Sequence, residues 1–376
     1  MTTPDRIATR PAAERARLFV RLTCLAALAF KFVSWPLWTG GSRLPIVPAL
    51  PVLEGTPLAV HVTLTIWSVL FLIILFFRPG SAGVARVLLV LELALCLLDQ
   101  ARWQPWEYQL VLTFTFLSLG DTKRFLQLTA LLVGAIYVFA GIHKIHPAFL
   151  HLVWDAMILK PFFGVTSASS AYPWLHRAGL LLPLAEVAVG VALLFVRHKR
   201  VAVMGALLLQ TSILLLVGPW ATGKNDILVA WNLWMAASVL LLFPTGERMT
   251  LQWKRFPEMI ALVLVVVMPI VGFFGFWPHY LSFDLYTGKA PYLLVEAERL
   301  PPQLRPYRSA AFSREGVTEA VWWHDVTSAK AGAMPYPETG YYQKLAREWK
   351  RLHPHDGLVF KEARYPFGPS DFKEVK

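Results

Sequence analysis

Long apolar runs separated by short polar connections fill the first three quarters of the chain. A run of about 20 apolar residues can cross a bilayer as a helix, and several of these runs approach that length. The glycines, prolines and charged residues between them are typical of helix ends. The pattern predicts nine membrane-spanning helices, at Leu18–Ser34, Thr56–Phe77, Gly83–Leu98, Trp106–Gly120, Phe125–His143, Gly179–Val196, Val201–Val217, Asp226–Phe243 and Glu258–Trp277. We therefore expect an all-α polytopic membrane bundle.

The composition supports a membrane protein. The chain is 56% hydrophobic and 16% charged, whereas soluble domains carry about 25% charged residues. In a soluble protein, a net charge of +12 would suggest nucleic-acid binding. Here, however, the basic residues lie in short connections between apolar runs. We expect contact with membrane lipid and no nucleic-acid partner. The two cysteines, Cys24 and Cys96, form no CxxC motif, which argues against a disulfide scaffold or a thiol relay.

Basic residues gather on one side of the predicted bundle. With the N-terminus inside, the N-terminal tail and the inner connections, including Arg248 and Lys254, hold fourteen lysines and arginines. The outer connections, including Lys224, hold six, and such an asymmetry marks the cytoplasmic side. We expect a cytoplasmic tail at 1–17, followed by an apolar run that is retained as an anchor because no small-residue cleavage site follows it. A transmembrane domain at 18–277 and an extracytoplasmic domain at 278–376 complete a protein of the inner (plasma) membrane.

The composition changes after Trp277, where proline, tyrosine and charged residues become frequent. The pattern predicts strands at Pro291–Glu298 and Gly357–Tyr365 and a helix at Glu338–Leu352. We expect a small α+β domain, without a phosphate-binding glycine-rich loop or a G-x-S-x-G motif.

The stretch from Tyr137 to Pro147 ends a long apolar run with a lysine, two histidines and a proline. At about 100° per residue, one stripe of its helix carries Gly134, Tyr137, Gly141 and Lys144. Glycines on this stripe allow a neighbouring helix to approach closely, so Lys144 points into protein and His143 lies on the opposite side. A lysine inside a membrane bundle suggests a functional site, although a lysine reaching out to interfacial water is the alternative.

Further polar residues lie at or near the outer ends of the predicted spans, with Glu92, Glu186 and Gln210 deeper. We predict a cavity that opens away from the cytoplasm. Its predicted lining residues are Asp99, Arg102, Gln109, Tyr137, His143, Lys144, Glu186 and Asn232. The alternatives are structural ion pairs for the deep charges and an aromatic membrane-interface belt for the segment 98–109. We predict no metal site, because the spacing of His143, His146 and His151 crosses Pro147 and brings no matching Cys or carboxylate pattern.

Three motifs together resemble the horizontally transferred transmembrane domain family, relatives of the vitamin K-dependent γ-carboxylase. They are Asp99-Gln-x-Arg-Trp-Gln-Pro-Trp-x-Tyr-Gln109, Ala140-Gly-Ile-His-Lys144 and the pair Trp231-Asn232. The resemblance implies that Lys144 is a base that deprotonates a reduced quinone, and that a quinone or quinol is the cofactor. His143 stands where the carboxylase has a second lysine, and the large lumenal portion that binds protein substrates is missing. Carboxylation of glutamate is therefore not expected.

Three function classes follow from these observations. The first is an enzyme in which Lys144 acts as base on a quinol-like or other amphiphilic substrate. The second is a quinol- or lipid-binding membrane subunit without chemistry of its own, as in the similar DoxX-like membrane proteins. A transporter is the third, and the lack of a visible inverted repeat argues against it.

Overall fold

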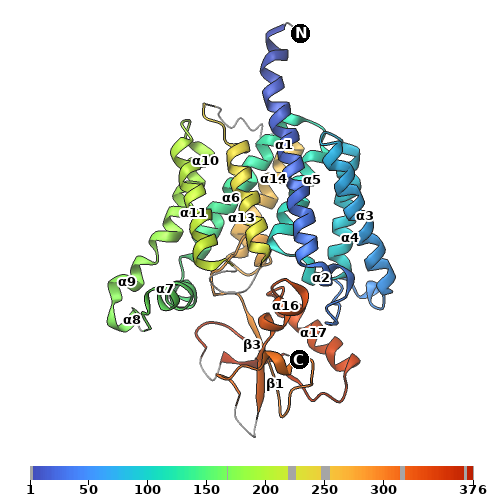
Figure 1. Ribbon diagram of the computed structural model, residues 1–376, viewed down its shortest axis with the longest axis vertical. Coiled ribbons are helices and arrows are strands. Elements are labelled where there is room, and N and C mark those ends of the chain that lie inside the picture. The colour runs from blue at the N-terminus through green and yellow to red at the C-terminus, as the bar shows by residue number, and fades with distance from the viewer. Residues whose placement is uncertain are drawn as a thin grey trace.

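The computed structural model describes residues 3–166, 168–218, 226–246, 255–313, 318–367 and 371–375. The basic residues Lys224, Arg248 and Lys254 lie outside these ranges. The chain is mostly helical up to residue 277, and a small sheet follows (Figure 1).

Each apolar run that the sequence predicts as a span forms a helix. The principal helices are α1 (Thr3–Val33), α3 (Leu58–Phe77), α4 (Ala82–Leu98), α5 (Pro105–Ser118), α6 (Thr122–Lys144), α10 (Leu181–Phe195), α11 (Arg200–Val217), α13 (Ile227–Leu242) and α14 (Phe256–Leu262). The last run continues beyond α14 through a π-helical segment, η4 (Val263–Val267), into α15 (Met268–Gly272). Short elements join the principal helices, namely α2 (Trp35–Thr39), η1 (Pro51–Leu53), η2 (Gln100–Arg102), the π-helical η3 (Phe149–Leu159), α7 (Lys160–Phe163), α8 (Ala168–Ala171), α9 (Pro173–Ala178) and η5 (Tyr280–Ser282).

Three helical stretches among the described residues are long and apolar enough to cross a membrane: Leu58–Phe77, Thr122–Lys144 and Pro173–Phe195. Nine transmembrane helices are therefore not supported. Helix α5 has 14 residues, because Pro105 begins it and it ends just before Gly120. Helix α1 is long, but Arg17, Arg21 and Lys31 lie in its apolar half. The remaining apolar helices are shorter than a bilayer requires.

Helix α6 lies at the centre of the helical part and is largely buried by its neighbours. Helix α10 packs along it at close range. A Cβ atom on Gly141 would lie 2.7 Å from the carbonyl oxygen of Pro183, and one on Gly190 would lie 2.9 Å from that of Gly134. These approaches leave no room for a side chain, so the predicted glycine stripe is confirmed as a helix-packing surface.

The C-terminal part contains a four-stranded sheet with the order β2-β1-β3-β4, in which all neighbouring strands are antiparallel. Its elements are β1 (Tyr292–Ala297), η6 (Arg305–Tyr307), β2 (Glu319–Trp322), α16 (Trp323–Ala331), α17 (Thr339–Leu352), β3 (Val359–Ala363) and β4 (Lys373–Glu374). The predicted strands at β1 and β3 and the predicted helix at α17 are confirmed. The sequence analysis missed β2, α16 and β4. Two of these strands are only two and four residues long, and β2 runs directly into α16.

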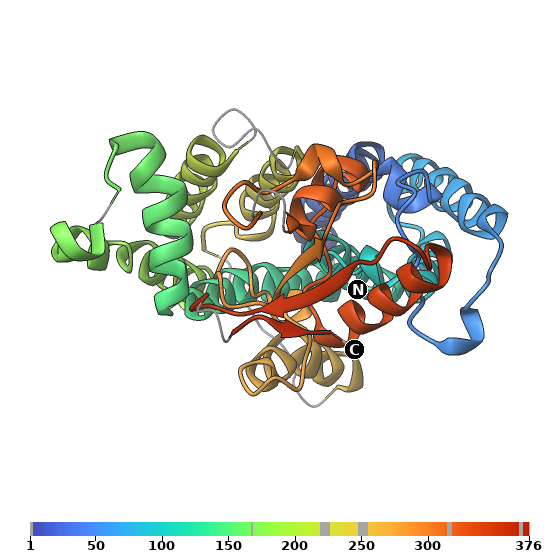
Figure 2. The same cartoon turned by 90° about the horizontal axis from the view of Figure 1, so that it is seen from below.

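This small domain lies across one end of the helices, and the N-terminus of α1 projects from the opposite end (Figures 1 and 2). Hydrogen bonds fix the domain in place. The Gln104 side chain donates to the carbonyl of Met334, and Lys344 donates to the carbonyls of Pro48 and Ala49. Both helical partners lie in connections near α2 and α5, so the domain covers the helix ends at which the predicted site lies.

Candidate functional site

A buried ion pair joins α6 to α10 at the end of the helices that faces the C-terminal domain. The Nζ atom of Lys144 lies 2.8 and 2.6 Å from the two carboxylate oxygens of Glu186. Lys144 is 6% exposed and Glu186 4% exposed, so both charges lie within protein. The stripe that carries Gly141 also places Lys144 against α10, which explains why these two helices supply the pair.

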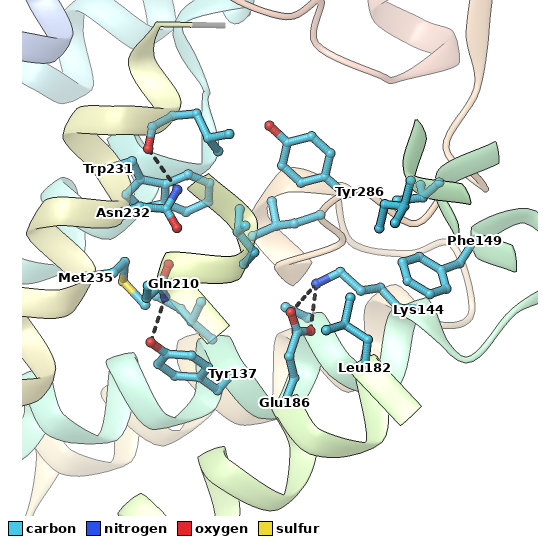
Figure 3. Close-up of a pocket in the computed structure, with 17 residues that line it drawn as sticks. Tyr137, Lys144, Phe149, Leu182, Glu186, Gln210, Trp231, Asn232, Met235 and Tyr286 are labelled. Carbon is cyan, nitrogen blue, oxygen red and sulfur yellow. Dashed lines mark hydrogen bonds and ion pairs between the residues drawn. The ribbon is translucent and has the colours of Figure 1, made fainter. Parts of the chain in front are cut away.

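The pair borders a cavity of about 90 Å³ (Figure 3). Residues of α6, η3, α10, α11, α13 and the segment before β1 line it, and most of the lining is apolar. The cavity residues are Ile136, Tyr137, Ala140, Lys144, Phe149, Val153, Ile158, Leu182, Glu186, Gln210, Ile213, Leu228, Trp231, Asn232, Met235, Leu285 and Tyr286.

Polar groups other than the ion pair lie on the α11 and α13 side of the cavity. The Gln210 amide donates to the Tyr137 hydroxyl at 2.6 Å, and Asn232 donates to the carbonyl of Leu228 at 2.8 Å. Behind this wall, the indole of Trp231 donates to the Gln109 side chain at 2.9 Å. The cavity therefore combines one charged end with a hydrogen-bonded polar wall and an apolar remainder.

The structure gathers four of the eight predicted site residues around this cavity: Tyr137, Lys144, Glu186 and Asn232. Gln109 supports the wall through Trp231 without lining the cavity. The residues Phe149, Val153 and Tyr286 were missed. The amphipathic pattern of the segment after Pro147 was the available signal for the first two, whereas nothing in the sequence places Tyr286 beside α13.

The prediction that Asp99 and Arg102 line the same cavity is wrong. Asp99 ends α4, where its carboxylate accepts hydrogen bonds from the backbone N–H groups of Ala101 and Val47. The Arg102 guanidinium turns toward α2 and α3, where backbone carbonyls and His61 take its hydrogen bonds. Both side chains are satisfied within their own corner of the fold, which is built from elements that do not border the cavity.

A second buried lysine–glutamate pair, Lys31 with Glu92, joins α1 to α4. Its Nζ–Oε2 distance is 2.8 Å, and Ser68 donates to the other carboxylate oxygen. Lys31 also lies 3.4 Å from the centre of the Trp38 ring. Neither charged residue borders the cavity, and their polar groups are occupied by protein partners. This pair is therefore a structural counterpart to the Lys144–Glu186 pair.

His143 does not line the cavity, so the prediction that it belongs to the lining is wrong. It lies on the side of α6 opposite Lys144, as the helix geometry indicates. Its ring stacks on Phe273 with centroids 4.1 Å apart, and its Nδ1 lies 2.5 Å from the Nζ of Lys289. Beside it, Asp284 forms a 2.6 Å hydrogen bond with His279. Burial raises the pKa of Asp284, but the His279 hydrogen bond and the Lys289 charge outweigh burial, so that the pKa is lowered. This network joins α6 to the segment before β1.

Comparison of the chain with protein-family models, with curated proteins and with solved structures gave no match.

Proposed function

We propose that the cavity takes the polar head of an amphiphilic, quinol-like molecule, and that the Lys144–Glu186 pair exchanges a proton with a hydroxyl group on that head. The observation that carries this proposal is a bidentate, buried ion pair bordering a cavity of largely apolar lining. Apolar pockets with a few converging polar groups are typical of small-molecule sites.

Stability alone does not account for such a pair. Two charges lose their hydration when they are buried, and an apolar pair of similar volume often stabilises a protein equally well or better. The Lys31–Glu92 pair illustrates a structural arrangement, because Ser68 and Trp38 complete its surroundings. The Lys144–Glu186 pair differs in that both residues border an open volume.

The geometry divides the chemical work between the two residues. A lysine acts as a base only as the neutral amine, whereas the bidentate contact with Glu186 is an interaction of the ammonium form. We therefore assign the acceptance of the hydroxyl proton to the Glu186 carboxylate. The Lys144 ammonium then stabilises the resulting oxyanion. This assignment revises the resemblance-based expectation, in which Lys144 itself is the base.

A second candidate is a binding subunit without chemistry, which the mutual pairing of Lys144 and Glu186 favours because each charge already has its partner. A volume of about 90 Å³ is below the roughly 150 Å³ of an engineered cavity that holds benzene. A ring-sized head therefore requires movement of lining side chains. A subunit that holds the ligand needs no proton transfer, and the two candidates share the same ligand class.

Co-purified ligands test the proposal. We expect wild-type protein, purified in mild detergent, to retain a quinone or another amphiphile that mass spectrometry of the extract detects. Glu186→Gln should reduce its amount severalfold, because the ion pair that binds the head is lost. Glu92→Gln removes the corresponding charge from the other buried pair and should leave the ligand complement unchanged. Identical complements in all three proteins would contradict the proposal.

We further propose a location in the inner membrane, with the N-terminus cytoplasmic and the C-terminal domain outside. Helix α3 supports membrane contact, because most of its polar side chains face the protein and its outward face exposes large apolar side chains. The exposed residues include Ile66, Trp67, Leu70, Ile73, Ile74 and Phe77. The connections between α3 and α4 and between α5 and α6 carry basic residues and lie at the end away from the domain, which supports a cytoplasmic location for that end.

Reporter fusions test this orientation. Alkaline phosphatase fused after Lys376 should be active in a bacterial host, because the enzyme folds only outside the cytoplasm. The same reporter fused after Gly120, at the other end of the helices, should be inactive. The opposite result from two stably expressed fusions would show that the orientation is reversed.

A further inference from the structure

Two histidines and an aspartate converge between α9 and η3, the helix that supplies part of the cavity wall. The Nδ1 of His176 lies 2.7 Å from Oδ2 of Asp155, and the Nδ1 of His151 lies 3.9 Å from the same oxygen. All three ligand atoms lie within 4.8 Å of one another, and each residue is half-buried. His151 and Asp155 come from η3, and His176 comes from α9.

We infer that His151, Asp155 and His176 bind a zinc-class transition-metal ion. Imidazole nitrogen is a preferred ligand for zinc, and a carboxylate with two imidazoles is a familiar three-residue set that leaves a fourth position for water. Zinc–ligand bonds of about 2.0–2.1 Å separate tetrahedral ligand atoms by about 3.3–3.4 Å. The two histidine nitrogens lie 2.7 and 3.9 Å from Oδ2 of Asp155, on either side of that spacing.

The surroundings of the triad support a built site. The Oδ1 atom of Asp155 is buried and accepts no hydrogen bond from the described residues. Buried polar atoms normally have a partner, so this oxygen is free to bind an ion. The neighbouring residue, Trp154, donates from its indole to the carbonyl of Leu175 at 2.9 Å. This bond joins η3 to α9, and its two residues directly precede the proposed ligands Asp155 and His176. The ring of Tyr365 stacks on His151 and covers one side of the triad.

A metal at this position has a consequence for the cavity. Helix η3 carries two ligands on one face and supplies Phe149, Val153 and Ile158 to the cavity wall. The ion would join η3 to α9 and thereby fix that wall. The simpler alternative is a His176–Asp155 hydrogen bond without any metal. That hydrogen bond needs no contribution from His151 or from the Oδ1 atom of Asp155.

Zinc titration of the full-length protein, after removal of any affinity tag and dialysis against EDTA, decides between these possibilities. We expect isothermal titration with zinc chloride to give one saturable site, and cobalt(II) to give visible absorption bands of a tetrahedral complex. Asp155→Asn keeps the shape and a hydrogen-bond acceptor for His176. It should nevertheless weaken zinc binding by at least the roughly 10–100-fold that loss of an outer-shell partner costs.

His176→Ala should weaken binding to a similar or greater extent, whereas His355→Ala, at an exposed histidine elsewhere, should leave it unchanged. Adding zinc should raise the midpoint temperature of thermal unfolding for the wild type and not for Asp155→Asn, since an ion that binds the folded state stabilises it. Absence of saturable zinc binding, or binding that survives both ligand replacements, would overturn the inference. Neither result depends on the proposed ligand of the cavity.

Discussion

Lys144→Met is expected to destabilise the protein by about 3–5 kcal/mol, because it leaves the Glu186 carboxylate buried without its partner. Adding Glu186→Leu should restore most of that loss, since two apolar side chains then fill the space of the pair. The double variant should nevertheless still fail to retain the amphiphilic ligand. Equilibrium unfolding in detergent measures the first two effects, and mass spectrometry of bound ligand measures the third.

The matched experiment uses the other buried pair. Lys31→Met together with Glu92→Leu should remain destabilised, because Ser68 loses the carboxylate oxygen to which it donates. Its ligand complement should match the wild type to the extent that the protein folds. If the double variant at 144 and 186 regains both stability and ligand, the pair contributes neither binding nor chemistry, and the proposed function fails.

Replacement of Lys144 by arginine separates chemistry from binding. Arginine keeps the positive charge and can pair with Glu186, but its planar group has a different shape and cannot lose its proton. Because the proposed mechanism keeps Lys144 charged throughout, Lys144→Arg should keep the ligand and much of the turnover. Loss of turnover with the ligand retained would instead show that Lys144 itself must lose a proton, and the base would then be Lys144 rather than Glu186.

The sequence predicted those features that depend on a single helix. Apolar periodicity located the helices, and the glycine spacing on α6 identified the face that α10 covers. The same spacing placed Lys144 on that face, so its contact with Glu186 agrees with the predicted cavity. His143 lay on the other side for the same reason, because successive residues of a helix differ by about 100° in direction.

Features that depend on which helices are neighbours were not predictable in this way. The polar segment 98–109 was assigned to the cavity because it lies near the outer end, as Lys144 does. In the structure α4 packs against α3 and α5, and α6 packs against α10, so Asp99 and Arg102 belong to a different corner. The triad of His151, Asp155 and His176 was missed similarly, because α7 and α8 separate its members along the chain.

The polar residues of segment 98–109 have a structural explanation, of which Arg102 is the centre. Its guanidinium is fully buried and donates to the carbonyls of Leu37, Trp38 and Leu95. It also lies 3.1 Å from Nδ1 of His61, which must accept because a guanidinium only donates. One side chain thus joins α2, α3 and α4 at the end of the helices that the C-terminal domain covers.

Arg102→Met is expected to cost at least about 4 kcal/mol of unfolding free energy, because several buried acceptors lose their donor at about 1–3 kcal/mol each. Arg102→Lys should lie between this variant and the wild type, since an ammonium group keeps the charge but cannot reproduce the planar set of donors. Detergent unfolding measurements on the two variants test this order.

Arg86 provides the matched control. Its guanidinium also donates to a backbone carbonyl, that of Ser118 at 3.2 Å, but from an exposed position where water can replace it. Arg86→Met should therefore change stability by no more than about 0.5 kcal/mol. If Arg102→Met is as mild as Arg86→Met, the arginine does not hold this corner together. The segment 98–109 would then need a role in ligand binding after all.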